Sequence, residues 1–313
     1  MTEDLILPVP DALPAMYLVP AAVSGVSGVS GVSGEAVQRR ARAAVAARIA
    51  EPLRGLTLRL LDESVLLTAP RLVTELPSIW PLRPAPDDMP AVQARAARDA
   101  TELIAFAALL VPSPGPVHEW ITRAAAAAFA AELGVPVVDA YLRRASTAEA
   151  ALASLPGAPE LAGIGGGFRL ADWLLVQYDD DCLMTRGLGR FGLPELKVDQ
   201  VPAELRAPWV LALTGLGQRL LELLRRELRR GSSSGGETAF IQVPAELVIG
   251  RAHIGLAYGC DLGDDPVLPV RLSLDPAVTD QRDSYLTLDA PDGAAADHRR
   301  ALATALLSRP AKV

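Results

Sequence analysis

A stretch rich in glycine and proline near the middle of the chain divides it into two halves. Residues 155–167 contain two prolines and five glycines, a density that interrupts helices and strands and is typical of a connection between domains. The chain has 313 residues, and a domain commonly has about 100–200, so two domains are expected. We therefore expect a linker at residues 151–169, between an N-terminal domain (35–150) and a C-terminal domain (170–313).

Residues 23–34 form a second segment with linker composition. They are four copies of Val-Ser-Gly, and short glycine- and serine-rich repeats behave as flexible connections. Residues 1–34 are therefore expected to be an N-terminal segment ending in this repeat. The apolar run Ala15–Val19 within it predicts a strand that belongs with the N-terminal domain.

Apolar spacing in the N-terminal half alternates between the periods of strands and helices. It predicts strands at 15–19, 56–61, 65–68 and 103–111, and helices at 35–49 and 91–100. This β-α-β-β-α-β order is that of the ferredoxin-like, or split βαβ, fold. A helix at 117–133, a strand at 135–140 and a short helix after the capping-box spacing of Ser146 and Glu149 are expected to follow.

The C-terminal half is expected to be a second α+β domain with an antiparallel sheet. Its clearest element is a helix from Pro208 to Arg230, which carries a leucine stripe and a basic C-terminal end that complements the helix dipole. Further patterns predict strands at 170–178, 182–186, 238–243, 267–274 and 285–288, and a helix at 294–307. Residues 245–258 are compatible with either helix or strand.

Composition excludes some classes of function. The net charge of −7 disfavours binding to nucleic acid or to an anionic membrane surface, because both need concentrated Lys and Arg. The acidic start of the chain and the prolines after it do not resemble a secretory signal, and Cys182 and Cys260 are too few for a disulfide framework. We expect a soluble, cytoplasmic protein with free thiols. The abundance of Ala and Arg, with Lys only at positions 197 and 312, suggests a bacterial source.

The candidate binding site lies in residues 185–196, Thr-Arg-Gly-Leu-Gly-Arg-Phe-Gly-Leu-Pro-Glu-Leu. Three glycines in this segment indicate unusual backbone conformations or the close approach of another group. The guanidinium groups of Arg186 and Arg190 could form bidentate hydrogen bonds to a carboxylate or phosphate. Phe191 and Glu195 lie beside them in the sequence and complete the candidate site. The alternative is a tight connection in which Glu195 forms an ion pair with Arg186 or Arg190.

This segment carries a resemblance. TRGLGRFGLPEL, followed by a long Leu-rich helix, resembles a strand-loop-helix block of bacterial proteins of unknown function. ITRAAAAAFAAELGVPVVDA, residues 121–140, resembles another block of the same proteins, an Ala-rich helix leading to a strand that ends in Asp. Together the blocks cover about a tenth of the chain. The resemblance implies a fold analogy and carries no chemistry.

Other polar segments are expected to be structural, so neither a metal nor a cofactor is predicted. Glycines 163 and 165–167 precede a strand and lack the lysine of a phosphate-binding loop. Asp179–Asp181, near Asp172, resembles a solvated turn more than a calcium loop. The three histidines lack the spacing of a zinc site; they are His118, His253 and His298.

From the sequence we expect a non-catalytic accessory or binding protein, whose partner is another protein or a second copy of the chain. The basis is the negative charge and the absence of a catalytic motif. The alternative is a small-ligand or phosphoester-handling enzyme, with Arg186 and Arg190 as anion clamps. In that enzyme Glu195 or an Asp from 179–181 would act as acid, base or metal ligand.

Overall fold

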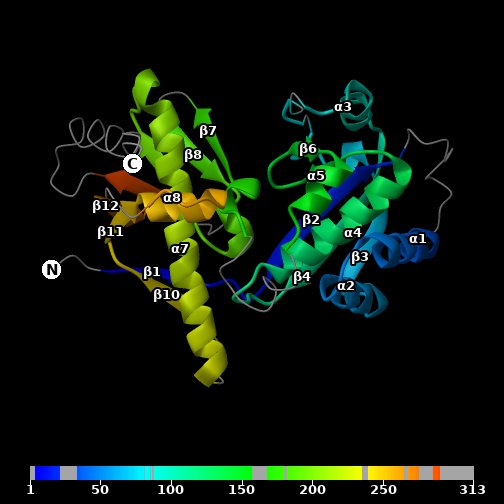
Figure 1. Ribbon diagram of the computed structural model, residues 1–313, viewed down its shortest axis with the longest axis horizontal. Coiled ribbons are helices and arrows are strands. Elements are labelled where there is room, and N and C mark those ends of the chain that lie inside the picture. Colours follow the sequence, from blue (N-terminus) through cyan, green and yellow to red (C-terminus); the bar gives the residue numbers. More distant parts are fainter. Residues whose placement is uncertain are drawn as a thin grey trace. The chain divides into compact units, whose positions relative to one another are not determined.

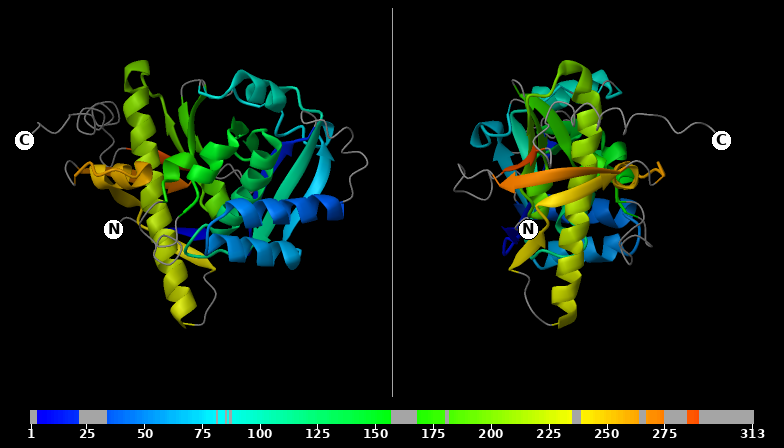
Figure 2. Two further views of the ribbon diagram at one scale, coloured as in Figure 1. Left: turned by 45° about the vertical axis from the view of Figure 1, so that its right-hand side comes forward. Right: turned by 90° about the vertical axis from the view of Figure 1, so that its left-hand side faces the viewer.

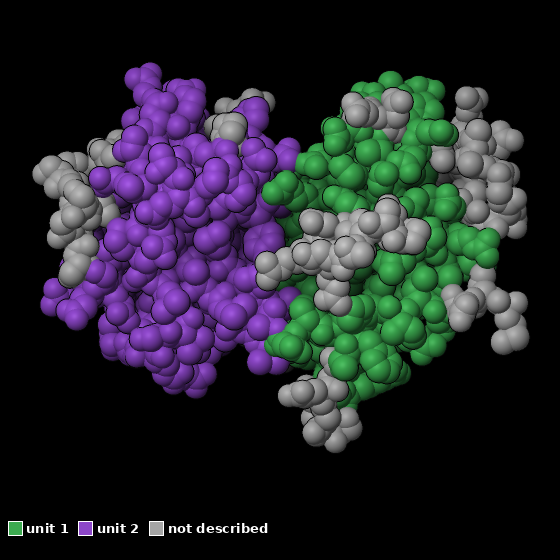
Figure 3. All heavy atoms as spheres, turned by 180° about the vertical axis from the view of Figure 1, so that it is seen from behind, with its two compact units in different colours: residues 1–11, 112–114, 168–313 green, residues 12–111, 115–167 purple. Residues whose placement is uncertain are grey.

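The computed structural model describes residues 4–21, 34–80, 82–84, 86, 88–156, 168–179, 182–234, 239–263, 267–274 and 285–289. The chain forms two compact units, coloured separately in Figure 3. Unit 1 comprises residues 1–11, 112–114 and 168–313, and unit 2 comprises residues 12–111 and 115–167. The expected helix at 294–307 and the Val-Ser-Gly repeat before Gly34 lie outside the described residues.

Unit 2 is built on a five-stranded sheet in the order β3-β4-β2-β5-β6, and each strand is antiparallel to its neighbours. The strands are β2 (Leu13–Pro20), β3 (Leu66–Leu72), β4 (Glu102–Leu110), β5 (Val137–Asp139) and β6 (Arg144–Ser146). The helices are α1 (Gly34–Arg48), α2 (Leu53–Asp62), α3 (Ala91–Arg98), α4 (Val117–Leu133) and α5 (Ala148–Ala153), with a 3-10 turn, η2, at Val73–Glu75.

Helical crossovers in unit 2 twice pass over one strand of the sheet. The chain leaves β2, forms α1 and α2, and returns as β3 on the far side of β4. It then leaves β4, forms α4, and returns as β5 on the far side of β2. The two central strands, β2 and β4, therefore lie between β3 and β5, the strands that follow the two crossovers.

Helices α1, α2 and α4 lie on one face of this sheet, whereas α3 packs on the other. Helix α4 packs on β2 and β4, and α1 and α2 pack against α4 (Figure 2). The ring of Phe106 on β4 meets that of Phe129 on α4, with centroids 5.4 Å apart. Pro116 precedes the first turn of α4, and Gly134 ends it in the left-handed conformation, as the sequence predicts.

The expected strand at residues 56–61 is wrong, because this segment lies within α2. The buried side chains of α2 are Leu53, Thr57, Leu60 and Leu61, whose spacing of four, three and one is that of a helix face. Short apolar runs fit a strand or a buried helix equally well, and the tertiary contacts of α2 with α4 select the helix. The capping box is also corrected, since Thr147 caps α5 by accepting from the N–H of Ala150.

Unit 1 contains a six-stranded sheet in the order β11-β12-β13-β9-β8-β7. The strands are β7 (Leu175–Asp179), β8 (Cys182–Arg186), β9 (Glu195–Asp199), β11 (Glu246–Gly250), β12 (Val267–Leu274) and β13 (Tyr285–Asp289). All pairs are antiparallel except β9 with β13, which is parallel. The expected antiparallel sheet is therefore mixed at one junction. The expected strand at 170–178 begins instead with a 3-10 turn, η3, at Leu170–Asp172.

A short ribbon in unit 1 joins distant parts of the sequence. Strand β1 (Leu5–Pro8) pairs antiparallel with β10 (Phe240–Val243). The chain start was expected to belong to a separate N-terminal segment, and this pairing groups residues 1–11 with unit 1 instead. Leu7 and Ile241 are buried on the inner side of the ribbon, which accounts for that grouping.

Helix α7 (Arg206–Ser234) is the longest helix described, and α8 (Arg251–Tyr258) lies across it in Figure 1. The two approach closely at Gly215, where an added Cβ would lie 2.7 Å from Cγ1 of Ile254. The ambiguous segment 245–258 is thus a strand, β11, followed by a helix, α8. Among the described residues, no helix is long and apolar enough to cross a membrane.

Candidate functional site

The loop between β8 and β9 is closed by the carboxylate of Glu195. Its Oε1 accepts from the backbone N–H groups of Gly187 (2.8 Å) and Gly189 (3.1 Å), and its Oε2 accepts from the hydroxyl of Thr185 (2.7 Å). The Thr185 oxygen accepts in turn from the N–H of Leu196 at 2.7 Å. Because one carboxylate accepts from three donors along the connection, Glu195 holds the loop between β8 and β9 together.

Glycine is required in this loop because of both conformation and space. Gly187 has φ 126°, a region that side chains disfavour, and an added Cβ would lie 2.3 Å from the carbonyl oxygen of Trp173. The 3-10 turn η4 (Leu188–Phe191) follows, and Gly192 ends it with φ 80°. The glycine density in the sequence therefore reflects a tight connection beside the backbone of Trp173.

The loop points two of its predicted site residues into unit 1. Arg190 is 0% exposed, with its guanidinium carbon 5.7 Å from the ring centroid of Trp173. Phe191 is also buried, and its ring meets that of Phe168 edge-on at 5.8 Å. Arg186, at the end of β8, is half-buried. The predicted residues are thus brought to one loop, where the described contacts hold the protein's own structure together.

Sequence reasoning missed a second buried arginine beside this loop. Arg225 on α7 places its guanidinium carbon 4.5 Å from the ring centroid of Phe168. The ring of Phe168 stacks on that of Trp173, with centroids 6.1 Å apart and an interplanar angle of 19°. Two arginines therefore flank one aromatic cluster, defined by Phe168, Trp173 and Phe191.

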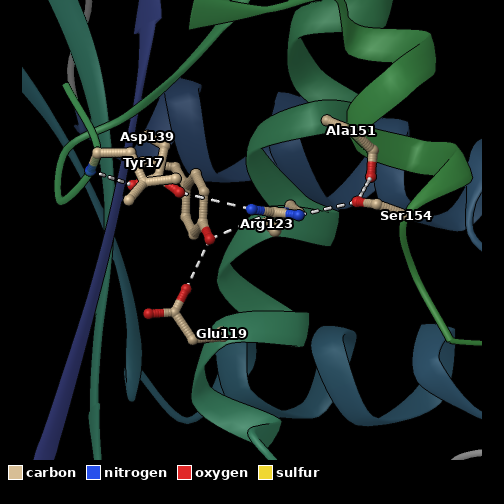
Figure 4. Close-up of polar contacts among 7 residues, drawn as sticks. Tyr17, Glu119, Arg123, Asp139, Ala151 and Ser154 are labelled. Atoms are coloured by element: carbon tan, nitrogen blue, oxygen red, sulfur yellow. Dashed lines mark hydrogen bonds and ion pairs between the residues drawn. The ribbon is translucent and has the colours of Figure 1, made fainter. Parts of the chain in front are cut away.

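Unit 2 contains a buried network of polar side chains that the sequence patterns did not predict (Figure 4). Tyr17 of β2 donates to Oε2 of Glu119 at 2.6 Å and accepts from Nε of Arg123 at 3.2 Å. The guanidinium of Arg123 also donates to Ser154 (2.9 Å) and to Asp139 (3.4 Å). The four ionisable members, Tyr17, Glu119, Arg123 and Asp139, are all buried.

The network connects side chains of α4 with side chains of β2, of β5 and of the residue that follows α5. Glu119 and Arg123 lie one turn apart on α4, Tyr17 lies on β2, and Asp139 ends β5 (Figure 4). Asp139 also accepts from the N–H of Leu142 at 3.0 Å, and Ser154 donates to the carbonyl of Ala151 at 2.8 Å. The signal available in the sequence was a pair of opposite charges four residues apart on a helix that is rich in alanine.

The other candidates occupy structural positions. Nδ1 of His253 accepts from the N–H of Gly250 at 3.1 Å, and burial lowers the pKa of this histidine, so the neutral imidazole caps α8. His118 is buried in the first turn of α4, and His298 lies outside the described residues, as do Asp180 and Asp181. In the described part of the chain, no three His, Cys, Asp or Glu side chains are grouped to hold a metal.

Comparison with protein-family models, with curated proteins and with solved structures gives no match for this chain.

Proposed function

We propose that this chain is a non-catalytic binding protein whose partner is another protein. The observation that carries the proposal is an apolar patch on the sheet of unit 2, formed by Leu67, Leu109 and Val111. Their exposed fractions are 55%, 62% and 73%. Clustered large apolar side chains on a surface favour interaction with another protein.

Strand register places these side chains together. Leu67 of β3 lies opposite Ala107 of β4, and Leu109 is two residues further along β4, so Leu67 and Leu109 share a face. Pro14 of β2 lies opposite Leu109 on its other side. Val111 continues the alternation just past the end of β4 and extends the patch.

The opposite end of the same face shows how such a surface is normally covered. There Leu18, Leu103 and Ala105 pack against side chains from the β3–β4 connection, among them Ile79 and Met89. That connection stops short of Leu67 and Leu109, which remain exposed. This apolar face of the sheet is covered at one end and exposed at the other. The exposed end therefore supports the proposal that another molecule covers it.

The occupant that we propose is an extended apolar segment of the partner. Strand β3 is the end strand of the sheet and pairs only with β4 among the described residues, so its outer edge can accept a further strand. Pro70 lacks an N–H donor, which leaves residues 66–69 as the usable edge. Alternate side chains of the added strand would then meet Leu67 and its neighbours.

The chemistry of the 185–196 loop supports a non-catalytic function. The Glu195 carboxylate is engaged by three donors, and Arg190 and Phe191 are buried. An acid or base for catalysis must reach the proton that it transfers. The enzyme alternative would need this loop to open, and a ligand screen by thermal shift with nucleotides, phosphate and divalent ions tests that alternative.

The arrangement of unit 2 also supports a ferredoxin-like, split βαβ fold for this unit, which we include in the proposal. The sheet order β3-β4-β2-β5 with two crossovers, each passing one antiparallel strand, is compatible with a ferredoxin-like, split βαβ fold. The elements differ from those expected, since the two helices of the first crossover are α1 and α2. We likewise propose a bacterial source and a cytoplasmic location, with which the reduced thiols of Cys182 and Cys260 are compatible.

Capture from the native host tests the proposed function. Tagged wild-type protein is compared with Leu109→Glu, which places a charge in the patch, and with Val92→Glu, which places the same charge on an exposed position of α3. We expect one stoichiometric protein that is retained by wild type and Val92→Glu and lost by Leu109→Glu, with all three folded by circular dichroism. Recovery of only the chain itself, or equal capture by Leu109→Glu, would reject the proposed surface.

A further inference from the structure

Arg225 is a buried cation that no described side chain neutralises directly. It is 6% exposed, and its Nε lies buried without a hydrogen-bond partner. Among the described residues, its guanidinium takes part in no hydrogen bond or ion pair, and its one cation–π contact is with the ring of Phe168. Burying a charge without a partner is costly, so natural proteins rarely retain one without a reason.

Glu222, the carboxylate whose charge acts on Arg225, already has other partners. Its Oε1 accepts from Gln218 at 3.2 Å, and its Oε2 lies 3.7 Å from the guanidinium of Arg219. One turn beyond Arg225, the side chain of Arg229 donates to the Arg225 carbonyl and adds a further positive charge. Burial lowers the pKa of Arg225 to about 10, Glu222 opposes this lowering and Arg229 adds to it. Arg225 is therefore still charged at neutral pH, and one carboxylate and one further arginine act on its charge.

Aromatic packing prepares this arginine for a ligand. A guanidinium over a ring gains a cation–π interaction, while its N–H groups, which lie in its own plane, are not consumed by the ring. Phe168 is itself held by Trp173 and Phe191, so the support for Arg225 is rigid. Arg190 places a second buried positive charge on the same cluster, over Trp173.

We propose that Arg225, held over Phe168, is the anchor of a binding site for a small anion, with a phosphate or carboxylate group accepting from the guanidinium. Such an anion would supply the missing counter-charge, and its two oxygens match the paired donors of arginine. The site lies in unit 1, whereas the apolar patch lies in unit 2. The protein would thus bind a small ligand in addition to its protein partner.

Titration calorimetry and thermal unfolding of the full chain test this proposal. The probes are inorganic phosphate and acetate, each compared with sodium chloride at equal ionic strength. We expect a saturable rise in the melting temperature of unit 1 with one of the two anions and none with chloride. The anion that binds identifies the ligand group as phosphate or carboxylate.

Three variants locate the site. Arg225→Gln removes the donor fork, and we expect the affinity to fall at least about tenfold, since a hydrogen bond to a charged group contributes roughly 1.5–3 kcal/mol. Arg225→Lys keeps the charge but loses the fork, so it serves if the glutamine variant fails to fold, and weaker binding is expected there too. Arg226→Gln changes the charge equally at an exposed position and should bind like wild type. Binding unaltered in both Arg225 variants, or no saturable effect of either anion on wild type, would overturn the proposal.

Discussion

Single polar side chains in this protein hold neighbouring backbone segments in place. The carboxylate of Glu195 accepts hydrogen bonds from the N–H groups of Gly187 and Gly189. These two N–H groups lie in the tight loop and do not pair with a neighbouring strand. The hydroxyl of Tyr17 connects two side chains in a similar way, since it donates to Glu119 and accepts from Arg123. Removing either group takes hydrogen bonds away from its partners, and a buried donor or acceptor that loses a bond lowers the free energy of unfolding.

The first prediction concerns Glu195. In Glu195→Gln, the amide replaces one charged acceptor oxygen with a donor that faces other donors. We expect a loss of about 1–3 kcal/mol in the free energy of unfolding of unit 1, measured by urea denaturation. Glu204→Gln removes the same charge from an exposed residue and should cost less than about 0.5 kcal/mol. Equal costs in the two variants would show that Glu195 does not hold the loop.

The second prediction concerns Tyr17. Tyr17→Phe removes only the hydroxyl, so Glu119 loses a donor and Arg123 loses an acceptor in a buried setting. We expect unit 2 to lose about 1–3 kcal/mol of stability. Tyr178→Phe, at an exposed ring, is the matched control. A neutral Tyr17→Phe would mean that the network of Figure 4 contributes nothing to stability.

Among the helices and strands, sequence patterns predicted the elements that carry a strong local signal and missed the elements whose signal is weak. Helix α4 was predictable because Pro116 and Gly134 mark its ends, and α7 because leucines repeat along one side. Helix α2 was not, since a short apolar run has no period of its own. Strand β9 was hidden because it starts at Glu195, within the segment that we assigned to the loop.

The third prediction compares two glycines of unit 1. Gly187 has positive φ and no space for a Cβ, whereas Gly263 has positive φ (73°) and nothing within 4 Å. Gly263→Ala should therefore cost only the backbone penalty, about 1 kcal/mol. Gly187→Ala must also displace the Trp173 carbonyl, so we expect a markedly larger loss in urea denaturation. Similar losses would contradict the close approach of the loop to Trp173.

The fourth prediction concerns the cap of α8. Burial lowers the pKa of His253 in the folded state, with Glu222 opposing and Arg219 reinforcing the shift. The unfolded chain therefore takes up a proton at a higher pH than the folded chain. The stabilisation is complete above the unfolded pKa of about 6.5 and is lost as the pH falls through the folded pKa.

His253→Gln keeps an acceptor at this position without a titrating group. Urea denaturation at pH 7.5 and 5.5 should show wild type losing more stability than the variant on acidification. A loss of equal size in both proteins would assign the pH dependence to other groups.

For the whole molecule, the sequence was enough to predict an α+β protein, and the structure shows that class in both units. The candidate site was harder to predict, because burial cannot be seen in a sequence. Arg190 was expected to clamp an anion and is buried over Trp173, while Arg225 was not singled out in the sequence and is buried over Phe168. The apolar patch was not visible either, since it depends on which residues of β3 and β4 face each other.

The most direct test of the central claim is hydrogen exchange of the protein alone and in complex with its captured partner. An added strand would protect those backbone N–H groups of residues 66–69 that point away from β4, along the open edge of β3. We predict slower exchange in that segment on binding, and no change in residues 185–196 of unit 1. Protection of residues 185–196 with none at 66–69 would contradict the account and would place the partner on the loop between β8 and β9.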